Sequence, residues 1–133
     1  MTDLKKIFCL HSLKRNKNYH MLEVGERPWG KYYVLEDEMH YKLKRIEVDP
    51  GHRLSYQFHH HRQEFWTVVQ GAAVVVLNGI EHHVKYSESI HIPLGAKHRI
   101  ENRSSELLVF IEVQTGTYFG EDDIVRLQDD YAR

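Results

Sequence analysis

Short runs of apolar, β-branched and aromatic residues alternate with turn residues along most of the chain. From Tyr32 onward these runs return at regular intervals, at residues 32–35, 41–48, 65–69, 72–77, 90–92 and 107–113. Such spacing is typical of an all-β domain, a small barrel or a sandwich. No stretch between residues 30 and 115 has the length and period of a helix. A short helix is expected only around residues 121–127.

Glycine, proline and asparagine residues between the runs indicate tight turns. Asn78 and Gly79 separate two apolar runs. This pair favours a type I′ hairpin turn, because both of its central residues must adopt positive φ. Pro50 and Gly51, and the group at 93–95, mark two further turns. We therefore expect many short strands joined by tight connections.

Length, charge and cysteine content exclude several classes of protein. The chain has 133 residues, the length of one ordinary domain. Its 18 basic and 19 acidic residues give a net charge of −1, which argues against a nucleic-acid-binding surface. No run approaches the roughly 20 apolar residues of a membrane-spanning helix, and the apolar run at 7–10 is too short for a secretory signal. A single cysteine, Cys9, cannot form an intramolecular disulfide. We expect a cytoplasmic protein with no nucleic-acid and no membrane partner.

Residues 1–24 differ in composition from the rest of the chain. They are rich in lysine, arginine and asparagine, above all at 14–18. We expect them to form an N-terminal arm that packs loosely or is partly disordered. The folded domain is then expected to span residues 25–133.

Eleven histidines, most of them in the middle third, direct attention to metal binding and proton transfer. Gln57, His59 and His61 are two residues apart, so on a strand they point to the same face. Glu64 opens the next run and can lie opposite that face after the chain turns back, and His98 follows later in the chain. A barrel brings such strands side by side, so imidazoles and a carboxylate from separate strands can converge on one ion.

The spacing of these residues resembles two known motifs. Five residues resemble the first motif of the cupin superfamily in type and spacing: Gly51, Gln57, His59, Glu64 and Gly71. Five residues further along the chain resemble the second cupin motif: Ser87, Pro93, Gly95, His98 and Asn102. Gln57 stands where many cupins have histidine, and Ser87 replaces a glycine. The resemblance implies an all-β, small single-domain cupin, a jelly-roll β-barrel with a short N-terminal arm.

Longer segments are similar to type II mannose-6-phosphate isomerases, and the similarity spans about residues 25–133. These segments are 27–30, 41–45, 54–62, 90–93, 97–99 and 120–133. In that family the cupin is often the C-terminal domain of a bifunctional enzyme that also carries a mannose-1-phosphate guanylyltransferase. Here we expect a stand-alone domain. The chain departs from the family at Phe65, where histidine is usual, and at Ala132, where glycine is usual.

The resemblance implies one divalent metal ion per chain, bound by Gln57, His59, Glu64 and His98. Zinc is the first expectation from the resemblance, and the mixed oxygen and nitrogen donors also suit manganese, cobalt, nickel or iron. Gln57 has an alternative role, because an amide oxygen is a weak ligand and could instead hydrogen-bond a metal-bound water. Glu112 and Gln114 interrupt an apolar strand face, so we expect them to line the wet part of the cavity.

The resemblance further implies that the protein interconverts mannose 6-phosphate and fructose 6-phosphate through a metal-stabilised enediolate. His61 is the expected base, although a carboxyl group in the cavity would also serve. Because His61 lies near a turn, it could instead bind the metal or be solvated. Arg126 is the second residue expected to act in catalysis. Lys42, Lys44 and Arg99 are expected to bind the phosphate, the alternative being a charged outer face of the barrel.

Functions of other classes remain open on the sequence alone. A non-enzymatic, metal-containing cupin could bind sugar phosphates or regulate polysaccharide or nucleotide-sugar metabolism. Another cupin enzyme, such as a dioxygenase, would need redox-active iron, whereas a metal-free nucleotide-sugar epimerase disagrees with the four-ligand spacing. A homodimer is expected from the resemblance.

Overall fold

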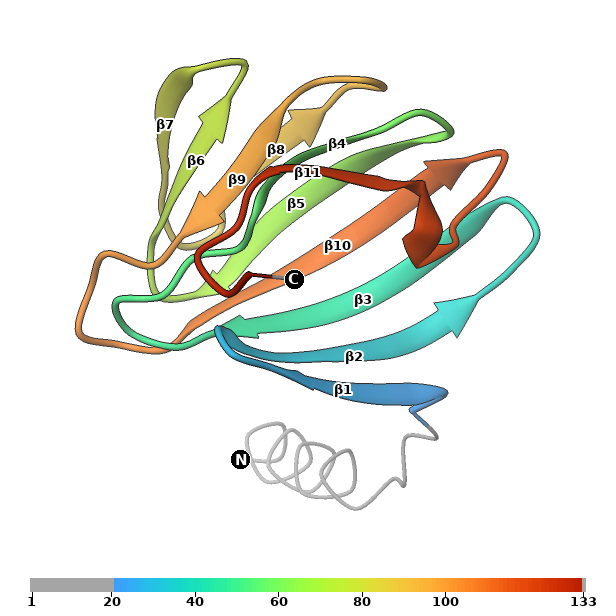
Figure 1. Cartoon of the computed structure of the whole chain (residues 1–133). Helices are drawn as coiled ribbons and strands as arrows, with labels where there is room; N and C mark the ends of the chain where they lie inside the picture. Colours follow the sequence, from blue (N-terminus) through green and yellow to red (C-terminus); the bar gives the residue numbers. More distant parts are fainter. Residues whose placement is uncertain (1–20, 133) are drawn as a thin grey trace, which may run out of the picture.

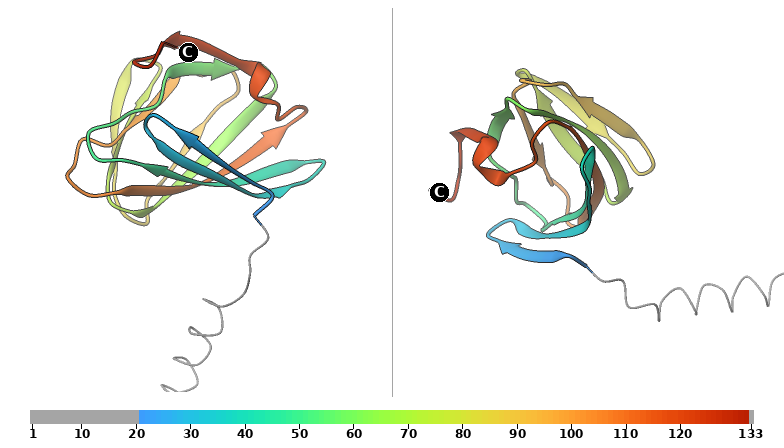
Figure 2. Two further views of the ribbon diagram at one scale, coloured as in Figure 1. Left: turned by 60° about the horizontal axis from the view of Figure 1, so that its bottom comes forward. Right: turned by 90° about the vertical axis from the view of Figure 1, so that its right-hand side faces the viewer.

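The computed structural model describes residues 21–132 and shows two β-sheets that face each other (Figures 1 and 2). Within these residues one sheet has six strands, in the order β1 (Glu23–Arg27), β2 (Gly30–Asp37), β3 (Tyr41–Val48), β10 (Leu108–Gly116), β5 (Arg62–Gln70) and β8 (Ser89–Ile92). The other has five, in the order β11 (Ile124–Gln128), β4 (Tyr56–His59), β9 (His98–Glu101), β6 (Ala73–Leu77) and β7 (Ile80–Val84). The expected all-β architecture is confirmed.

The space between the sheets is apolar at one end and polar at the other. Strands β3, β10 and β5 lie side by side and bury every second residue along most of their length. Toward one end these residues join side chains of the opposite sheet in an apolar core: Trp29, Ile46, Val48, Trp66, Val68, Ala73, Val75, Val84, Ile92, Ala96, Ile100, Leu108 and Phe110. Toward the other end the strand register places Glu112 beside Lys44, and Gln114 beside Glu64. The same alternation therefore builds both a core and a polar pocket.

Backbone geometry confirms the expected turns. Asn78 and Gly79 have φ of 48° and 81°, as a type I′ hairpin between β6 and β7 requires. Gly51 has a φ of 75° in its turn. Ser87, which replaces the glycine of the cupin motif, has a φ of 65°. Because a side chain in this left-handed region costs roughly 1–2 kcal/mol, the usual glycine at this position has a physical reason.

The helix expected at residues 121–127 is wrong for most of its length. A single 3₁₀ turn, η1 (Glu121–Asp123), is followed by the extended strand β11, which pairs with β4. In Figure 1 this segment, drawn in red, runs alongside β4 at the edge of its sheet. Pairing with β11 satisfies backbone groups that an edge strand would otherwise leave open. This tertiary contact outweighs the local preference for a helix.

Most of the expected N-terminal arm, residues 1–20, lies outside the described residues. Strand β1 begins at Glu23, so the last residues assigned to the arm belong to the six-stranded sheet. Gly25 is the only buried residue of β1, which explains why hydrophobic alternation did not reveal this strand. The expected boundary after residue 24 therefore falls inside β1. Within residues 21–132 no helix has the length and hydrophobicity needed to cross a membrane.

Candidate metal centre

Three buried side chains from three strands converge at the polar end of the barrel. His59 ends β4, Glu64 lies on β5 and His98 begins β9. His59 Nε2 is 3.2 Å from Glu64 Oε1, and His98 Nε2 is 3.8 Å from Glu64 Oε2. One donor atom from each residue lies within 4.8 Å of the other two. Two imidazoles and a carboxylate at this spacing form a set that can hold a transition-metal ion.

The hydrogen bonds of the two histidines leave their Nε2 atoms facing the shared space. His98 Nδ1 lies 2.8 Å from the carbonyl oxygen of Ala96, and His59 Nδ1 lies 3.4 Å from that of Asp123. Both Nε2 atoms are buried and have no hydrogen-bond partner among the described residues. Burial lowers the pKa of His98, which favours the neutral ring with a free lone pair. A buried nitrogen without a partner is costly unless something binds it, so these residues fit a metal ion.

Gln57 lies beside this group but makes a hydrogen bond of its own. It is paired with His98 in the strand register, and its side chain lines the adjoining cavity. Its Oε1 accepts a hydrogen bond of 2.8 Å from the hydroxyl of Ser55. An amide oxygen has a second lone pair, so this contact is compatible with ligation and with binding a metal-bound water. Its role as a fourth ligand stays a prediction.

Glu64 is held as a carboxylate by donors on both oxygens. Arg62 Nε donates to Oε1 over 3.1 Å, and Trp66 Nε1 donates to Oε2 over 3.0 Å. Burial alone would raise the pKa of Glu64, but its interactions with His59 and His98 lower this pKa well below the usual range. A metal ligand must be deprotonated, and this environment favours that form.

Glu112 lies behind Glu64 in a contrasting environment. The Trp66 N–H group that donates to Glu64 is shared with Glu112, whose Oε1 lies 3.1 Å from Trp66 Nε1. Gln114 Nε2 donates to Glu112 Oε2 over 2.9 Å. Burial and the nearby charge of Glu64 raise the pKa of Glu112 to about 8, against the opposing charge of Lys44. Gln114 Oε1 is buried without a hydrogen-bond partner among the described residues. Both side chains are buried in the interior, but only Glu112 lines the cavity, so the expectation that both would line it is met for Glu112 alone.

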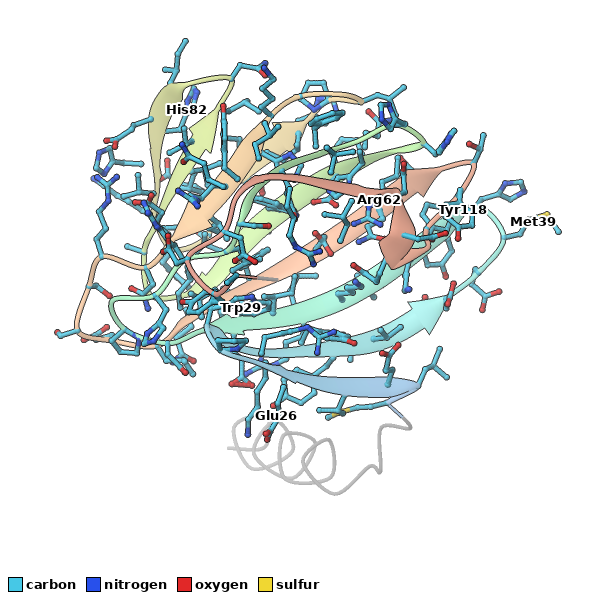
Figure 3. The ribbon with its side chains drawn as sticks, viewed as in Figure 1. Glu26, Trp29, Met39, Arg62, His82 and Tyr118 are labelled. Carbon is cyan, nitrogen blue, oxygen red and sulfur yellow. The ribbon has the colours of Figure 1, made fainter. Side chains whose placement is uncertain are left out.

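A cavity of about 110 Å³ adjoins Glu64 and reaches the surface beside the exposed residues Arg27 and Arg126. Its lining contains charges of both signs: Arg27, Lys44, Arg62 and Arg126 are cationic, and Glu64, Glu112 and Glu121 are acidic. The apolar and neutral lining residues are Trp29, Tyr32, Ile46, Leu54, Ser55, Gln57 and Ile124. Trp29 and Arg62, labelled in Figure 3, lie toward opposite ends of the barrel interior. The cavity can therefore receive a small polar anion next to the candidate metal ligands.

Comparison with known proteins agrees with this arrangement. Residues 14–129 match the family model described as "Mannose-6-phosphate isomerase C-terminal". The chain belongs to this family. It is 45% identical over 131 residues to the mannose-1-phosphate guanylyltransferase ManC of Salmonella typhimurium, covering 98% of this chain and 27% of that protein. The chain thus spans about a quarter of the length of this relative, and of other curated relatives.

Solved structures show the same cupin fold. The capsular polysaccharide assembling protein CapF from Staphylococcus aureus superposes with a TM-score of 0.71 at 22% identity, covering 80% of this chain and 34% of CapF. A sugar phosphate isomerase from a cupin superfamily, from Silicibacter pomeroyi, superposes with a TM-score of 0.61 at 21% identity. That match covers 75% of this chain and 76% of the other. The cupin architecture expected from the two motifs is confirmed.

Two of the residues expected at the cavity of this cupin lie elsewhere. His61 is exposed, and its ring lies edge-on to Tyr118, in a surface depression formed with Asp122 and Asp123. Strand β4 ends at His59, so the alternation that would have turned His61 inward stops before it. Arg99 follows His98 on β9, so the two side chains point to opposite faces. Its guanidinium donates to the backbone carbonyl oxygens of Leu54 and Gln128, and Arg99 is not among the residues that line the cavity.

The other predicted cations are placed nearer the site. Lys44 is buried, lines the cavity and forms an ion pair of 2.7 Å with Glu121. Lys42 is also buried in the interior, but it is not among the cavity-lining residues, and its Nζ lies 3.9 Å from Asp37. Arg126 lines the cavity from β11. The alternative of a charged outer face is therefore wrong for both lysines, while the phosphate-binding roles stay predictions.

Some residues of the site were not singled out from the sequence. Arg62 and Trp66 contact Glu64, and Arg27 and Glu121 line the cavity. Arg62 and Trp66 could have been found, because they flank Glu64 at a spacing of two and so share its face of the strand. Arg27 and Glu121 carry no such signal, since they reach the cavity from the first strand and from the C-terminal turn.

Proposed function

We propose that the chain is a metal-dependent isomerase that interconverts mannose 6-phosphate and fructose 6-phosphate. The observation that carries this proposal is the buried group of His59, Glu64 and His98, with two unpartnered imidazole nitrogens, beside a cavity whose lining includes four cationic side chains. Membership of the family described as "Mannose-6-phosphate isomerase C-terminal" supports the choice of substrate. The chain spans only part of its relatives, so this activity is proposed for the cupin domain itself.

In this proposal one divalent ion is bound by His59, Glu64 and His98, with Gln57 as the fourth candidate ligand. Zinc is the proposed ion. When bound, it would act as a Lewis acid on the substrate oxygens at C1 and C2. The protein prepares the ligands in advance, because the backbone carbonyls of Ala96 and Asp123 orient the two histidine rings.

The phosphate group of the substrate is bound by cations at the mouth of the cavity. Arg27 and Arg126 approach from β1 and β11, and neither forms an ion pair with a carboxylate among the described residues. Lys44 and Arg62, deeper in the cavity, are already paired with Glu121 and Glu64. An unpaired guanidinium is well suited to bind a phosphate, because its N–H groups match the phosphate oxygens in geometry and charge. We therefore assign the phosphate to Arg27 and Arg126.

An aldose–ketose exchange also needs a group that moves a proton between C1 and C2. Such a group must lie within hydrogen-bond reach of the bound sugar. The carboxyls of Glu112 and Glu121 line the cavity, whereas His61 does not. A cavity carboxyl is therefore the better candidate for the base.

The proposal is tested by measuring fructose 6-phosphate formation in an enzyme-linked assay, with the metal content determined on the same samples. His59→Ala should lose both the metal and the turnover. His82→Ala, which removes an exposed histidine of β7 (Figure 3), is the matched control and should keep both. Turnover by a metal-free His59→Ala chain would contradict the proposal. Bound metal and sugar phosphate without turnover in the wild-type chain would instead favour a binding or regulatory cupin.

A further inference from the structure

Each carboxylate oxygen of Glu64 accepts one hydrogen bond from a neighbouring side chain. Arg62 holds Oε1, the oxygen nearest His59, and the indole of Trp66 holds Oε2, the oxygen that faces His98. Each oxygen thus has one protein hydrogen bond and one imidazole nitrogen close to it. The direction in which Glu64 offers its lone pairs to a metal depends on these two donors.

Trp66 is placed rigidly enough to set that direction. Its side chain is 3% exposed and belongs to the apolar core. The indole packs against the ring of Phe110 at 5.2 Å and lies edge-on to the ring of His98 at 5.5 Å. One side chain therefore touches two of the three metal-ligand candidates, His98 by packing and Glu64 by a hydrogen bond.

The indole N–H group of Trp66 also donates to a second carboxyl group, that of Glu112. It is shared between Glu64 Oε2 and Glu112 Oε1, at 3.0 and 3.1 Å. Glu112 is itself fixed by the side-chain amide of Gln114. All three residues, Trp66, Glu112 and Gln114, lie on the adjacent strands β5 and β10. A neutral donor in this position orients the ligand without adding a charge that would repel the metal.

We propose that Trp66 is a positioning residue of the metal centre, which orients Glu64 through its indole N–H. This inference rests on the metal binding that is part of the proposed function. Removing a partner of a metal ligand outside the coordination shell typically weakens metal affinity by about 10- to 100-fold. The indole ring contributes to the core as well, so the test must remove the N–H and keep an aromatic side chain.

Trp66→Phe makes that change, and Trp29→Phe is its matched control. The control removes another buried indole of the core, one with no hydrogen bond to a metal-ligand candidate among the described residues. Affinity for Zn²⁺ is measured by competition with a chromophoric chelator, and Co²⁺ absorption reports the geometry of the ligands. Trp66→Phe should bind Zn²⁺ roughly 10- to 100-fold more weakly than wild type and change the Co²⁺ spectrum. Trp29→Phe should leave both near the wild-type result.

A measurement on the wild-type chain covers the case in which Trp66→Phe does not fold. The chain has two tryptophans, so a ¹H–¹⁵N spectrum contains two indole N–H signals. Trp29→Phe assigns them. Saturation with Zn²⁺ should shift the Trp66 signal strongly and leave that of Trp29 nearly unchanged.

The outcomes separate this inference from the proposed function. Wild-type protein that binds Zn²⁺, with unchanged affinity in Trp66→Phe or an unmoved Trp66 indole signal, overturns the positioning role and leaves the metal centre intact. Wild-type protein that takes up no metal overturns both. Weakened binding in Trp66→Phe alone, together with a shifted indole signal, supports the inference.

Discussion

His98→Ala should abolish the stabilisation of the fold by metal. In the wild-type chain an ion bound only to the folded state stabilises it by RT ln(1 + [L]/Kd), about 2.7 kcal/mol at a metal concentration 100 times Kd. For a domain of this size that corresponds to roughly 10 °C in Tm. Removing one of three buried ligands should reduce this shift to near zero.

The difference between melts with and without metal is the quantity to compare, not the Tm alone. His98 is 1% exposed, and its Nδ1 pairs with the carbonyl oxygen of Ala96. Losing that partner costs about 1–3 kcal/mol by itself, whether or not metal is present. Thermal unfolding followed by circular dichroism, in chelator and in a series of Zn²⁺ concentrations, separates the two effects.

An exposed histidine provides the control for weak binding of metal to surface imidazoles. His82→Ala should keep the full metal-dependent shift. A His98→Ala chain that still gains about 10 °C at the same metal concentration would refute the assignment of the ligands. Loss of the shift in both variants would show that the stabilisation arises at the surface.

Three further substitutions test separate parts of the account. Arg126→Ala should raise KM for mannose 6-phosphate by about tenfold through loss of a charged hydrogen bond, with metal content unchanged; an unchanged KM would contradict the phosphate assignment. His61→Ala should keep kcat near wild type in the isomerase assay, because His61 lies outside the cavity, and a large fall would restore it as a candidate base. Asp123→Ala removes the acceptor of the His60 and His61 backbone N–H groups and should lower the free energy of unfolding by about 1–3 kcal/mol in urea. Unchanged stability would mean that water replaces this contact.

The central part of the site could be predicted from the sequence because it depends on strand alternation. His59, Glu64 and His98 each lie on a short strand, and all three are buried within one cluster. The same rule placed Glu112 and Gln114 in the interior, two and four residues beyond the buried Phe110. Where a strand is regular, a spacing of two is enough to assign a side chain to a face.

The sequence was less informative where a strand ends or a contact is remote. His61 follows the last residue of β4, and its backbone N–H donates to Asp123, so it leaves the face that Gln57 and His59 share. The C-terminal segment was expected to be helical, and pairing with β4 made it a strand that carries Arg126 to the cavity. Such contacts join residues more than 60 positions apart, and no local pattern encodes them.

The burial of charged side chains could not be predicted from the sequence either. A lysine on a strand is usually exposed, yet Lys44 is 6% exposed. Burial alone would lower the pKa of Lys44, but Glu112 and Glu121 raise it, so the ammonium group stays charged in the interior. The register of β3 against β10 sets this arrangement, because it places Lys44 directly opposite Glu112.

The most direct test of the central claim is a titration of isomerase turnover against bound metal. The chain is stripped with a chelator and reloaded with Zn²⁺ in steps, and each sample is analysed both for metal and for conversion of mannose 6-phosphate. Turnover should be absent in the stripped chain and should rise in proportion to bound metal until one ion per chain is reached. Turnover that survives complete removal of metal, or a fully loaded chain without turnover, would contradict this claim.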